Sequence, residues 1–441
     1  MRSKLFSIII CLLALSVGFG SCIKDENASS ELSVSTIVTA FGLDTVYGKH
    51  YKFSIDQLNH VIFNADSMPV GSDSILARIL IDTFTASGYV TSGINDTLVV
   101  TSDSMDLRKA INNDVGMHFN IYSGDLETIQ EYTLKINVHM QEPDSMSWKQ
   151  MSDMPEGFLT SSMGSKQKVV TLNDSILVFD ASDATAIKAY IADGANPAAY
   201  QWSTVTVNGL PEDTDIRSLT TSQGTLYAVS TSGDVYTSTN GESWTRSESL
   251  SGNVVALLGS LSTRLAAIRT VDGTQRFCTT ESPAGTWTDG ETVPTGFPTY
   301  NYSYTYQVSG TGTERIVLTG MPAQSGKTVP WMSMDGTGWA DMATSSTYYC
   351  PEIENPSITY YDDKYYIIGG ELDTVYASIG GLAWEGTTTK FTLPDDLAGA
   401  GTDYTMTVDD KKFVWIAISG TAGNKNQLWR GRLNKFGFKK Q

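Results

Sequence analysis

A short repeat that runs from an aromatic residue to a tryptophan is the feature that most constrains the fold of this chain. Its copies, the last two with looser spacing, lie at residues 236–244, 331–339, 376–384, 190–202 and 277–287. A turn containing glycine lies inside each regular copy, as in the Asn240-Gly241 pair. Asn-Gly pairs between apolar runs join the strands of tight β-hairpins, because both residues tolerate positive φ. The repeat therefore predicts a series of similar hairpins.

The number of tryptophans indicates how this series closes. Six copies carry a third-strand aromatic residue: Tyr190, Tyr236, Phe277, Trp331, Tyr376 and Trp429. The last copy ends early and has no following tryptophan, whereas a spare one, Trp148, lies just after the linker 141–145. We therefore expect the segment around Trp148 to supply the fourth strand of the last repeat. Repeats of about 40–50 residues with four strands predict a six-bladed β-propeller over residues 146–441, closed by an N-terminal strand.

The region before the repeats is expected to be a separate domain, since 441 residues are too many for one hydrophobic core. Residues 34–140 hold short alternating apolar runs, which are typical of strands. These runs lie at residues 32–41, 51–55, 76–81, 97–101, 117–121 and 132–140. Their number and spacing predict an antiparallel β-sandwich of immunoglobulin type. The whole chain is therefore expected to be all-β.

The N-terminus has the pattern of a targeting segment. Arg2 and Lys4 precede an apolar run at 5–17, which is too short for a spanning helix. Small residues then lead to Cys22, and this pattern resembles a bacterial lipobox. The following Lys-Asp-Glu at 24–26 resembles the surface-export signal of Bacteroidetes lipoproteins. The resemblance implies a signal peptide over 1–21, a lipid on Cys22, a tether over 22–33 and a cell-surface location on the outer membrane. A simple secretory peptide with a coincidental cysteine is the alternative.

Charge and composition exclude several classes of function. The net charge is −18, which disfavours nucleic acid as a partner. All four histidines lie before the repeats and are scattered, so no metal or cofactor is expected. Cys278 and Cys350 could form a disulfide in an oxidising compartment or remain as two separate buried thiols.

The repeats resemble two propeller families. Ser333-Met-Asp-Gly-Thr-Gly-Trp339 looks like a degenerate Asp-box of sialidase-type propellers, and Tyr365–Gly370 looks like part of a Kelch blade. Together with the lipobox and the sandwich, the chain resembles a family of Bacteroidetes surface lipoproteins. These motifs are structural turns and carry no chemistry. Sialidase chemistry is disfavoured because the arginines do not form the family's pattern. Copper-radical chemistry on a Kelch propeller would need histidines, which the repeat region lacks.

Candidate ligand-binding residues lie near the loops that lead into the first strand of each repeat. Those loops are residues 206–215, 248–253, 290–301, 343–355 and 388–402. Arg217 lies on an expected inner strand, and the stripe Tyr300-Asn-Tyr302-Ser-Tyr304-Thr-Tyr306 places its rings on one side of another. Packing between blades explains the stripe, and a sugar platform made by Tyr300 and Tyr302 is the alternative. Tyr348 and Tyr349 lie in the next loop.

The sequence favours a non-catalytic module that binds a glycan or a protein. A carbohydrate-active enzyme, glycosidase or lyase, is the alternative, with loop carboxylates as candidates: Glu212, Asp213, Glu352, Glu354, Asp395 and Asp396. A structural envelope component is a third hypothesis. Asp-Ser and Asp-Thr pairs also resemble a short O-glycosylation acceptor, with acceptor residues Thr45, Ser67, Ser74, Thr97, Ser104 and Ser145. Such pairs also simply begin turns.

Overall fold

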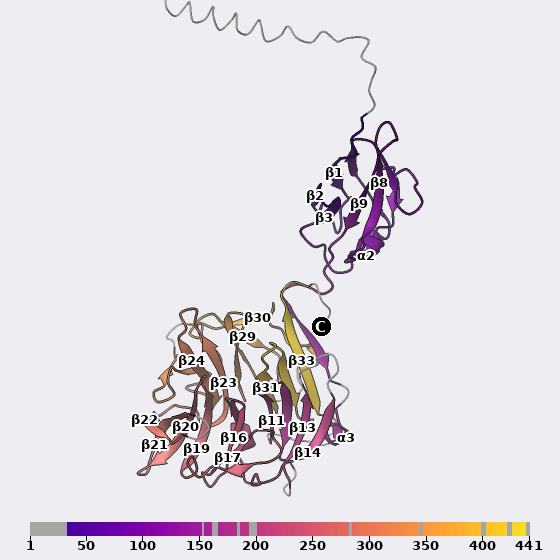
Figure 1. Cartoon of the computed structure of the whole chain (residues 1–441). Helices are drawn as coiled ribbons and strands as arrows, with labels where there is room; N and C mark the ends of the chain where they lie inside the picture. Colours follow the sequence, from indigo (N-terminus) through magenta and orange to yellow (C-terminus); the bar gives the residue numbers. More distant parts are fainter. Residues whose placement is uncertain are drawn as a thin grey trace, which may run out of the picture. The chain divides into compact units, whose positions relative to one another are not determined.

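The computed structural model describes residues 33–151, 154–160, 166–182, 186–193, 201–281, 285–343, 347–397, 403–420 and 426–437. The chain divides into two compact units after Glu142 (Figure 1). The expected signal peptide, Cys22 and nearly all of the tether lie outside the described residues. Within the described ranges, no helix is long and apolar enough to cross a membrane. Strands make up nearly all of the regular secondary structure described in both units, which confirms the all-β prediction.

The first unit contains one five-stranded sheet and two short strand pairs. The large sheet has the order β2 (Phe53–Asp56), β3 (Val61–Asn64), β9 (Ile129–Lys135), β8 (Met117–Tyr122) and β6 (Tyr89–Ser92). The pairs are β1 (Val38–Gly42) with β5 (Thr83–Ala86), and β4 (Ile79–Leu80) with β7 (Ser104–Met105). One turn of helix, α2 (Asp73–Leu76), and a 3-10 turn, η1 (Arg108–Ala110), complete it.

The first unit differs from the predicted antiparallel sandwich in three places. Strands β3 and β9 are parallel. The expected strand at 76–81 begins as the end of α2 and is reduced to β4, and the expected strand at 97–101 is absent from the strands described there. The core nevertheless has the expected alternation: β8 buries every second residue, and Phe84 packs edge-on against Phe119 at 5.2 Å.

The second unit contains six four-stranded antiparallel sheets, numbered here in chain order by their first strands. Sheet 1 is β11 (Gln167–Leu172), β12 (Ser175–Asp180), β13 (Lys188–Asp193) and β14 (Trp202–Thr206); sheet 2 is β15 (Thr220–Ser222), β16 (Thr225–Val229), β17 (Val235–Ser238) and β18 (Thr245–Arg246); sheet 3 is β19 (Val254–Ser260), β20 (Arg264–Val271), β21 (Thr274–Glu281) and β22 (Thr288–Thr292). Sheet 4 is β23 (Tyr300–Val308), β24 (Glu314–Met321), β25 (Trp331–Ser333) and β26 (Ala340–Asp341); sheet 5 is β27 (Ser357–Tyr361), β28 (Lys364–Ile368), β29 (Val375–Ser378) and β30 (Glu385–Thr387). Sheet 6 is β31 (Tyr404–Val408), β32 (Val414–Ile418), β33 (Gln427–Asn434) and β10 (Ser145–Gln150). The helix α3 (Glu156–Thr160) and the 3-10 turns η2 (Ile216–Ser218) and η3 (Asp395–Leu397) lie between strands.

The first strands of the six sheets, called the inner strands below, surround a central channel. Each inner strand contacts the inner strand of the next sheet, and β31 of sheet 6 contacts β11 of sheet 1. The inner strands of sheets 1 and 6, which are the farthest apart in sequence, therefore lie side by side (Figure 1).

Strand β10 completes sheet 6, as the number of tryptophans predicts. It pairs antiparallel with β33 from Ser145 opposite Asn434 to Gln150 opposite Trp429. The Trp148 ring packs over Gly431, where a Cβ atom would approach the ring to 2.3 Å, and the indole N–H donates to the carbonyl of Thr392 at 2.7 Å. The start of the unit is thus joined to its end by a ladder and by a side chain.

Six tryptophans occupy equivalent seams between neighbouring sheets. The outer tryptophan of each sheet packs against the sheet before it: Trp244 lies 6.0 Å from Phe179 of sheet 1, and Trp339 lies 6.0 Å from Phe277 of sheet 3. The others are Trp202 against sheet 6, Trp287 against sheet 2, Trp384 against sheet 4 and Trp148 against sheet 5. The tryptophan series therefore marks the contacts between sheets all the way around the ring.

The three regular repeats share one turn geometry. In the copy that ends at Trp339, the Gly336 N–H donates to Ser333 Oγ at 2.8 Å, and the indole N–H donates to the Gly336 carbonyl at 3.3 Å. The glycine has φ +80°, and a Cβ atom there would lie 2.5 Å from Thr279. The same two hydrogen bonds recur before Trp244 and Trp384. The turn is a structural element, in agreement with its interpretation from sequence.

Candidate functional site

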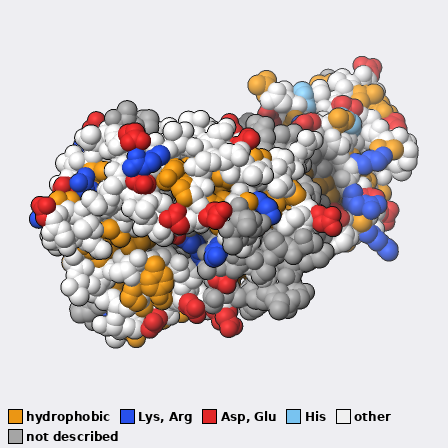
Figure 2. Space-filling model, turned by 90° about the horizontal axis from the view of Figure 1, so that it is seen from below, with side chains coloured by type: hydrophobic (Ala, Val, Ile, Leu, Met, Phe, Trp, Pro, Cys, Tyr) orange, Lys and Arg blue, Asp and Glu red, His pale blue; other side chains and the backbone are white. Residues whose placement is uncertain are grey.

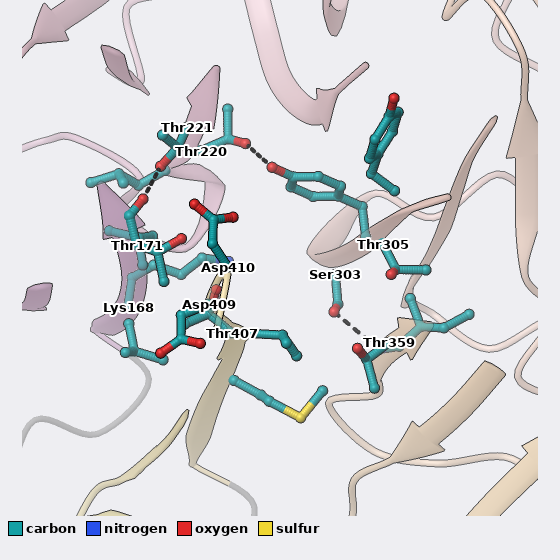
Figure 3. Close-up of a pocket in the computed structure, with 18 of the residues that line it drawn as sticks. Lys168, Thr171, Thr220, Thr221, Ser303, Thr305, Thr359, Thr407, Asp409 and Asp410 are labelled. Carbon is teal, nitrogen blue, oxygen red and sulfur yellow. Dashed lines mark hydrogen bonds between the residues drawn. The ribbon is translucent and has the colours of Figure 1, made fainter. Parts of the chain in front are cut away.

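The central channel of the second unit holds a cavity of about 430 Å³. Its walls come from five of the six inner strands: β11, β15, β23, β27 and β31. Hydroxyl groups dominate the wall, from Thr171, Thr220, Thr221, Ser303, Thr305, Thr359 and Thr407 (Figure 3). On β23 the wall hydroxyls of Ser303 and Thr305 are two residues apart, because successive residues of a strand point to opposite faces.

Hydrogen bonds between inner strands hold several wall residues in place. Tyr304 Oη lies 2.7 Å from Thr220 Oγ1, and Thr221 Oγ1 donates to the Thr171 carbonyl at 2.8 Å (Figure 3). Ser303 Oγ accepts from the Ile358 N–H at 3.1 Å. The wall is therefore ordered by contacts that join sheets 1, 2, 4 and 5.

Two carboxylates and a lysine lie at the end of the cavity where the inner strands finish. Asp409 accepts hydrogen bonds from the Phe413 N–H at 2.8 Å and from the Trp415 indole at 2.9 Å, so it fixes the turn after β31. Asp410 and Lys412 line the cavity beside it. This end of the channel carries both signs of charge.

A second, smaller pocket of about 20 Å³ lies at the other end, where the inner strands begin. Lys168 and Ser303 belong to both pockets, so the two adjoin. The charged side chains that line the small pocket are Lys168 of β11 and Arg217 of η2, and no carboxylate lines it among the described residues. This end of the channel is thus lined by two basic side chains, and the carboxylates of Asp215 and Asp403 lie close enough to act on Arg217.

Arg217 is held by groups from sheets 5 and 6. Its Nη1 donates to Asn355 Oδ1 at 3.3 Å and to the Tyr404 carbonyl at 3.0 Å. Tyr404 is fully buried, and its hydroxyl donates toward the carbonyls of Asn355 and Ile368, both at 2.9 Å. Burial lowers the pKa of Arg217, while the carboxylates of Asp403 and Asp215 act in the opposite direction. The guanidinium therefore has a fixed place at the pocket.

Lys168 lies near Arg217 without a carboxylate partner within ion-pair distance among the described residues. Its pKa falls from the ordinary 10.5 to about 8, because burial disfavours the charged amine and Arg217 repels it, whereas Asp215 attracts it. Asp215 is turned toward its own backbone, since its Oδ1 accepts the Arg217 N–H at 3.1 Å as the cap of η2. Burial disfavours the charged form of the Asp215 carboxyl and raises its pKa.

The tyrosine stripe does not keep the strict alternation that was expected. A bulge between Tyr300 and Ser303, with Asn301 at φ +52°, interrupts β23. Tyr302 packs into the core of sheets 3 and 4, and its hydroxyl donates to the Pro298 carbonyl at 2.9 Å. Burial raises the pKa of Tyr302. Tyr300 is 51% exposed and lies outside that core.

The structure brings two of the five predicted ligand residues together. Arg217 and Tyr302 both line the small pocket. Tyr349 instead lines a groove of about 180 Å³ between sheets 4 and 5, where the Lys327 ammonium lies 4.3 Å from its ring centre. Tyr300 and Tyr348 are exposed and line none of these three spaces.

None of the predicted loop carboxylates and neither of the two cysteines lines the channel. The six loop acids are exposed, and none lines either pocket of the channel. Cys278 and Cys350 are both buried free thiols, so the two-thiol alternative holds and the disulfide alternative does not. Burial raises the pKa of Cys350 to about 12 and raises that of Cys278 as well, so both thiols stay protonated.

The predicted glycosylation acceptors differ in exposure. Ser74, Thr97 and Ser104 are exposed, whereas Thr45, Ser67 and Ser145 are half-buried. Ser145 begins β10 and lies opposite Asn434. Acidic side chains elsewhere are scattered in small groups over the face seen in Figure 2.

Sequence reasoning missed most of the channel wall. Lys168, Thr220, Ser303 and Thr407 lie on four strands that are distant in sequence. The one available signal was a lysine within the apolar run Gln167-Lys168-Val169-Val170, where a buried strand otherwise has no charge.

Two family models match the chain. Residues 142–441 match the one described as DUF6242 beta propeller domain. Residues 25–136 match the one described as Domain of unknown function (DUF6242) N-terminal domain. No curated protein matches the chain.

Solved structures resemble the chain only remotely. AofleA from Arthrobotrys oligospora has a TM-score of 0.39 and 15% identity, covering 64% of this chain and 85% of its own. The GH93 alpha-L-arabinofuranosidase of Fusarium graminearum, solved with arabinobiose, has a TM-score of 0.38 and 10% identity, covering 67% and 98%. The alpha-L-arabinanase of Penicillium chrysogenum, also with arabinobiose, has a TM-score of 0.40 and 13% identity, covering 68% and 98%. Similarity at this level carries no functional argument.

Proposed function

This chain belongs to the DUF6242 family, and on that premise we propose that its β-propeller domain is a non-catalytic module that binds a glycan in the central channel. The observation that carries the proposal is the hydroxyl-rich cavity. Its volume of about 430 Å³ falls within the range of small-molecule sites. Threonine and serine hydroxyls both donate and accept hydrogen bonds, which suits a ligand made of hydroxyl groups.

The chemistry of the region favours binding over turnover. Residues 143–441 contain no histidine. This region therefore has no residue for acid–base or nucleophilic catalysis that depends on histidine. Of the two carboxylates at the cavity, Asp409 is engaged in holding the turn after β31. The wall is ordered by its own hydrogen bonds, which favours recognition by a preformed surface.

We further propose that the six sheets are the blades of a six-bladed propeller closed by β10, with an immunoglobulin-like sandwich before it. A lipid on Cys22 would then hold the protein at the outer membrane, facing the surroundings of the cell. The sequence pattern around Cys22 supports this placement.

The lipid anchor can be tested separately from binding. We expect the unaltered chain to partition into the membrane fraction of its host and Cys22→Ser to lose the lipid and leave that fraction, because one acylated residue is the proposed anchor. Metabolic labelling with a fatty acid followed by fractionation measures both effects. A labelled Cys22→Ser variant, or an unlabelled membrane-bound parent chain, would contradict the proposal.

Glycan binding should depend on open space in the channel. We expect the purified full chain to bind a subset of glycans on an array and Thr407→Trp to lose that binding, because the indole would fill the cavity beside Thr407. Thr245→Trp is the matched control, since Thr245 is exposed on outer strand β18. An array without signal would contradict the proposal and favour a structural role in the envelope. Equal binding by both variants would place the ligand elsewhere.

A carbohydrate-active enzyme is the second candidate, and Asp410 is the observation that favours it. This carboxylate lines the cavity, and within the described ranges its side chain accepts no hydrogen bond, unlike that of Asp409. Turnover of a polysaccharide panel by the full chain, abolished by Asp410→Asn, would establish that alternative.

A further inference from the structure

The turn η2 lies across the channel at the end where the inner strands begin. It precedes the inner strand of sheet 2, yet it contacts the inner strands of sheets 1, 3 and 4. Arg217 extends this reach, because its Nη1 donates to Asn355 Oδ1 at 3.3 Å and to the Tyr404 carbonyl at 3.0 Å, at the starts of sheets 5 and 6. Sheet 5 is three places from sheet 2 in either direction around the ring, so Arg217 spans the channel.

The side chains around this crossing leave little space. Asn355, Ser357 and Thr405 line the small pocket and are buried, and within the described ranges no residue that lines this pocket is exposed. The pocket has about 20 Å³, slightly more than the roughly 10–15 Å³ that one water needs. This end of the channel therefore admits a water molecule but no sugar ring.

A tyrosine ring fills the side of the channel that faces sheet 3. Tyr304 of β23 lies over Gly259 of β19, where a Cβ atom would approach the ring to 2.5 Å. Its Oη lies 2.7 Å from Thr220 Oγ1 of sheet 2. Sheet 3 accordingly contributes none of the described residues that line the large cavity. The Tyr304 ring is thus a fixed wall held by three sheets.

The other end of the channel, where the inner strands finish, is open to solvent. Exposed side chains line the large cavity there: Asn173 in the turn after β11, and Asp410 and Lys412 in the turn after β31. Gly224, in the turn after β15, lines it as well. The loops that lead into the inner strands, which the sequence favoured as the ligand face, lie at the closed end instead.

We propose that the channel is a blind pocket that receives the end of a glycan chain through the turns after β11, β15 and β31. This inference rests on the proposed glycan-binding function and assigns its ligand class, a chain terminus rather than an inner segment. A polymer that passed through the channel would need an exit at the end that η2 and Arg217 close. The terminal sugar lies against the hydroxyls of the wall, and the rest of the chain leaves by the opening through which it entered.

The first test blocks one end of the channel at a time in the purified full chain. Serine replaces Cys11 and Cys22 throughout, which leaves the two buried thiols and makes an added cysteine the exposed one. A long polyethylene glycol maleimide on Lys412→Cys should weaken binding to a glycan array roughly tenfold or more, because the polymer covers the open end. The same adduct on Glu212→Cys is the matched control and should leave binding unchanged, since Glu212 is exposed at the closed end and lines neither pocket.

The second test asks whether the unaltered chain recognises a terminus. The array carries linear oligosaccharides of glucose, mannose, galactose and arabinose, each coupled to the surface either through its reducing end or through the opposite end. We expect a bound oligosaccharide to bind in one of the two orientations. A bulky benzoyl group on its free terminal sugar should abolish that binding, because a blind pocket has no room beyond the terminus. The same group on the sugar next to the surface is the control and should leave binding intact.

Each outcome separates this inference from the proposed function. If the benzoyl group on the free terminal sugar is tolerated, or if the adduct on Glu212→Cys also abolishes binding, glycan binding stands and the blind pocket is wrong. Binding that survives both adducts would place the ligand outside the channel. An array without signal would remove the proposed function and this inference with it. Each variant is measured before and after modification, so a loss caused by misfolding appears already before the polymer is attached.

Discussion

Replacing residues 145–150 with a glycine–serine segment of equal length should unfold the second unit or leave it barely stable. The change removes β10 from β33, the Trp148 indole from the seam between sheets 5 and 6, and the hydrogen bond to Thr392. Loss of a fully buried tryptophan costs about 3–5 kcal/mol, and Trp148 is partly buried, so its loss contributes a part of that cost. The bare edge of β33 adds a risk of aggregation. Domains have about 5–15 kcal/mol in total, so the expected loss is a large part of it.

Tryptophan fluorescence during urea unfolding measures this effect, because all nine tryptophans lie after residue 147 and report on the second unit alone. Lys149→Ser is the control, since Lys149 is exposed on the same strand and should change stability by less than about 0.5 kcal/mol. A glycine–serine variant that unfolds at the same urea concentration as the parent chain would show that β10 does not close the ring.

Lys168→Met should stabilise the protein at neutral pH. A lowering of the lysine pKa from 10.5 to about 8 corresponds to roughly 3 kcal/mol of unfavourable burial of charge. Lys168 is half-buried, so solvent screening reduces this value, and we expect a gain of about 1–3 kcal/mol in the free energy of unfolding. Methionine has an unbranched apolar side chain like the stem of lysine, and its volume is similar to that of lysine. A residue that costs stability in this way is typical of a functional site.

The pH dependence of the gain follows from the same shift. Below about pH 8 both the folded and unfolded states carry the protonated lysine, so the full cost is present. Between about 8 and 10.5 the unfolded state binds more protons, and the stability contributed at Lys168 rises with pH. The advantage of Lys168→Met should therefore shrink across this window and vanish above it. Urea unfolding followed by fluorescence at several pH values measures it.

Lys166→Met is the matched control for this second prediction. Lys166 is exposed two residues earlier, so the same change in side chain should have little effect at any pH. Destabilisation by Lys168→Met at pH 7, or a gain that does not change with pH, would contradict the account of a cation in an unfavourable place.

The ring of sheets was predictable because its signals are local and repeated. The tryptophans at 148, 202, 244, 287, 339 and 384 recur at the same place in each sheet, so counting them placed β10 in sheet 6. The first unit was less predictable. Its parallel pair β3 and β9 joins segments about 70 residues apart, and alternation alone does not give strand direction.

The channel could not be predicted in the same way. Its wall combines residues from five inner strands that meet only when the ring closes, and each strand contributes only a few of them. Arg217 was found because the sequence placed it on an inner strand; that placement was wrong, since Arg217 lies in the turn η2 just before β15. Thr220, Ser303 and Thr359 look like ordinary strand residues. The bulge at Asn301 moved Tyr300 away from Tyr302, and sequence alternation cannot show a bulge.

A crystal structure of the full chain with the glycan that binds most strongly on the array tests the central claim most directly. We predict a sugar in the central channel, with hydrogen bonds to hydroxyls of the cavity wall such as that of Ser303. A sugar bound instead in the groove beside Tyr349, or on the outer strands with the channel empty, would contradict the claim.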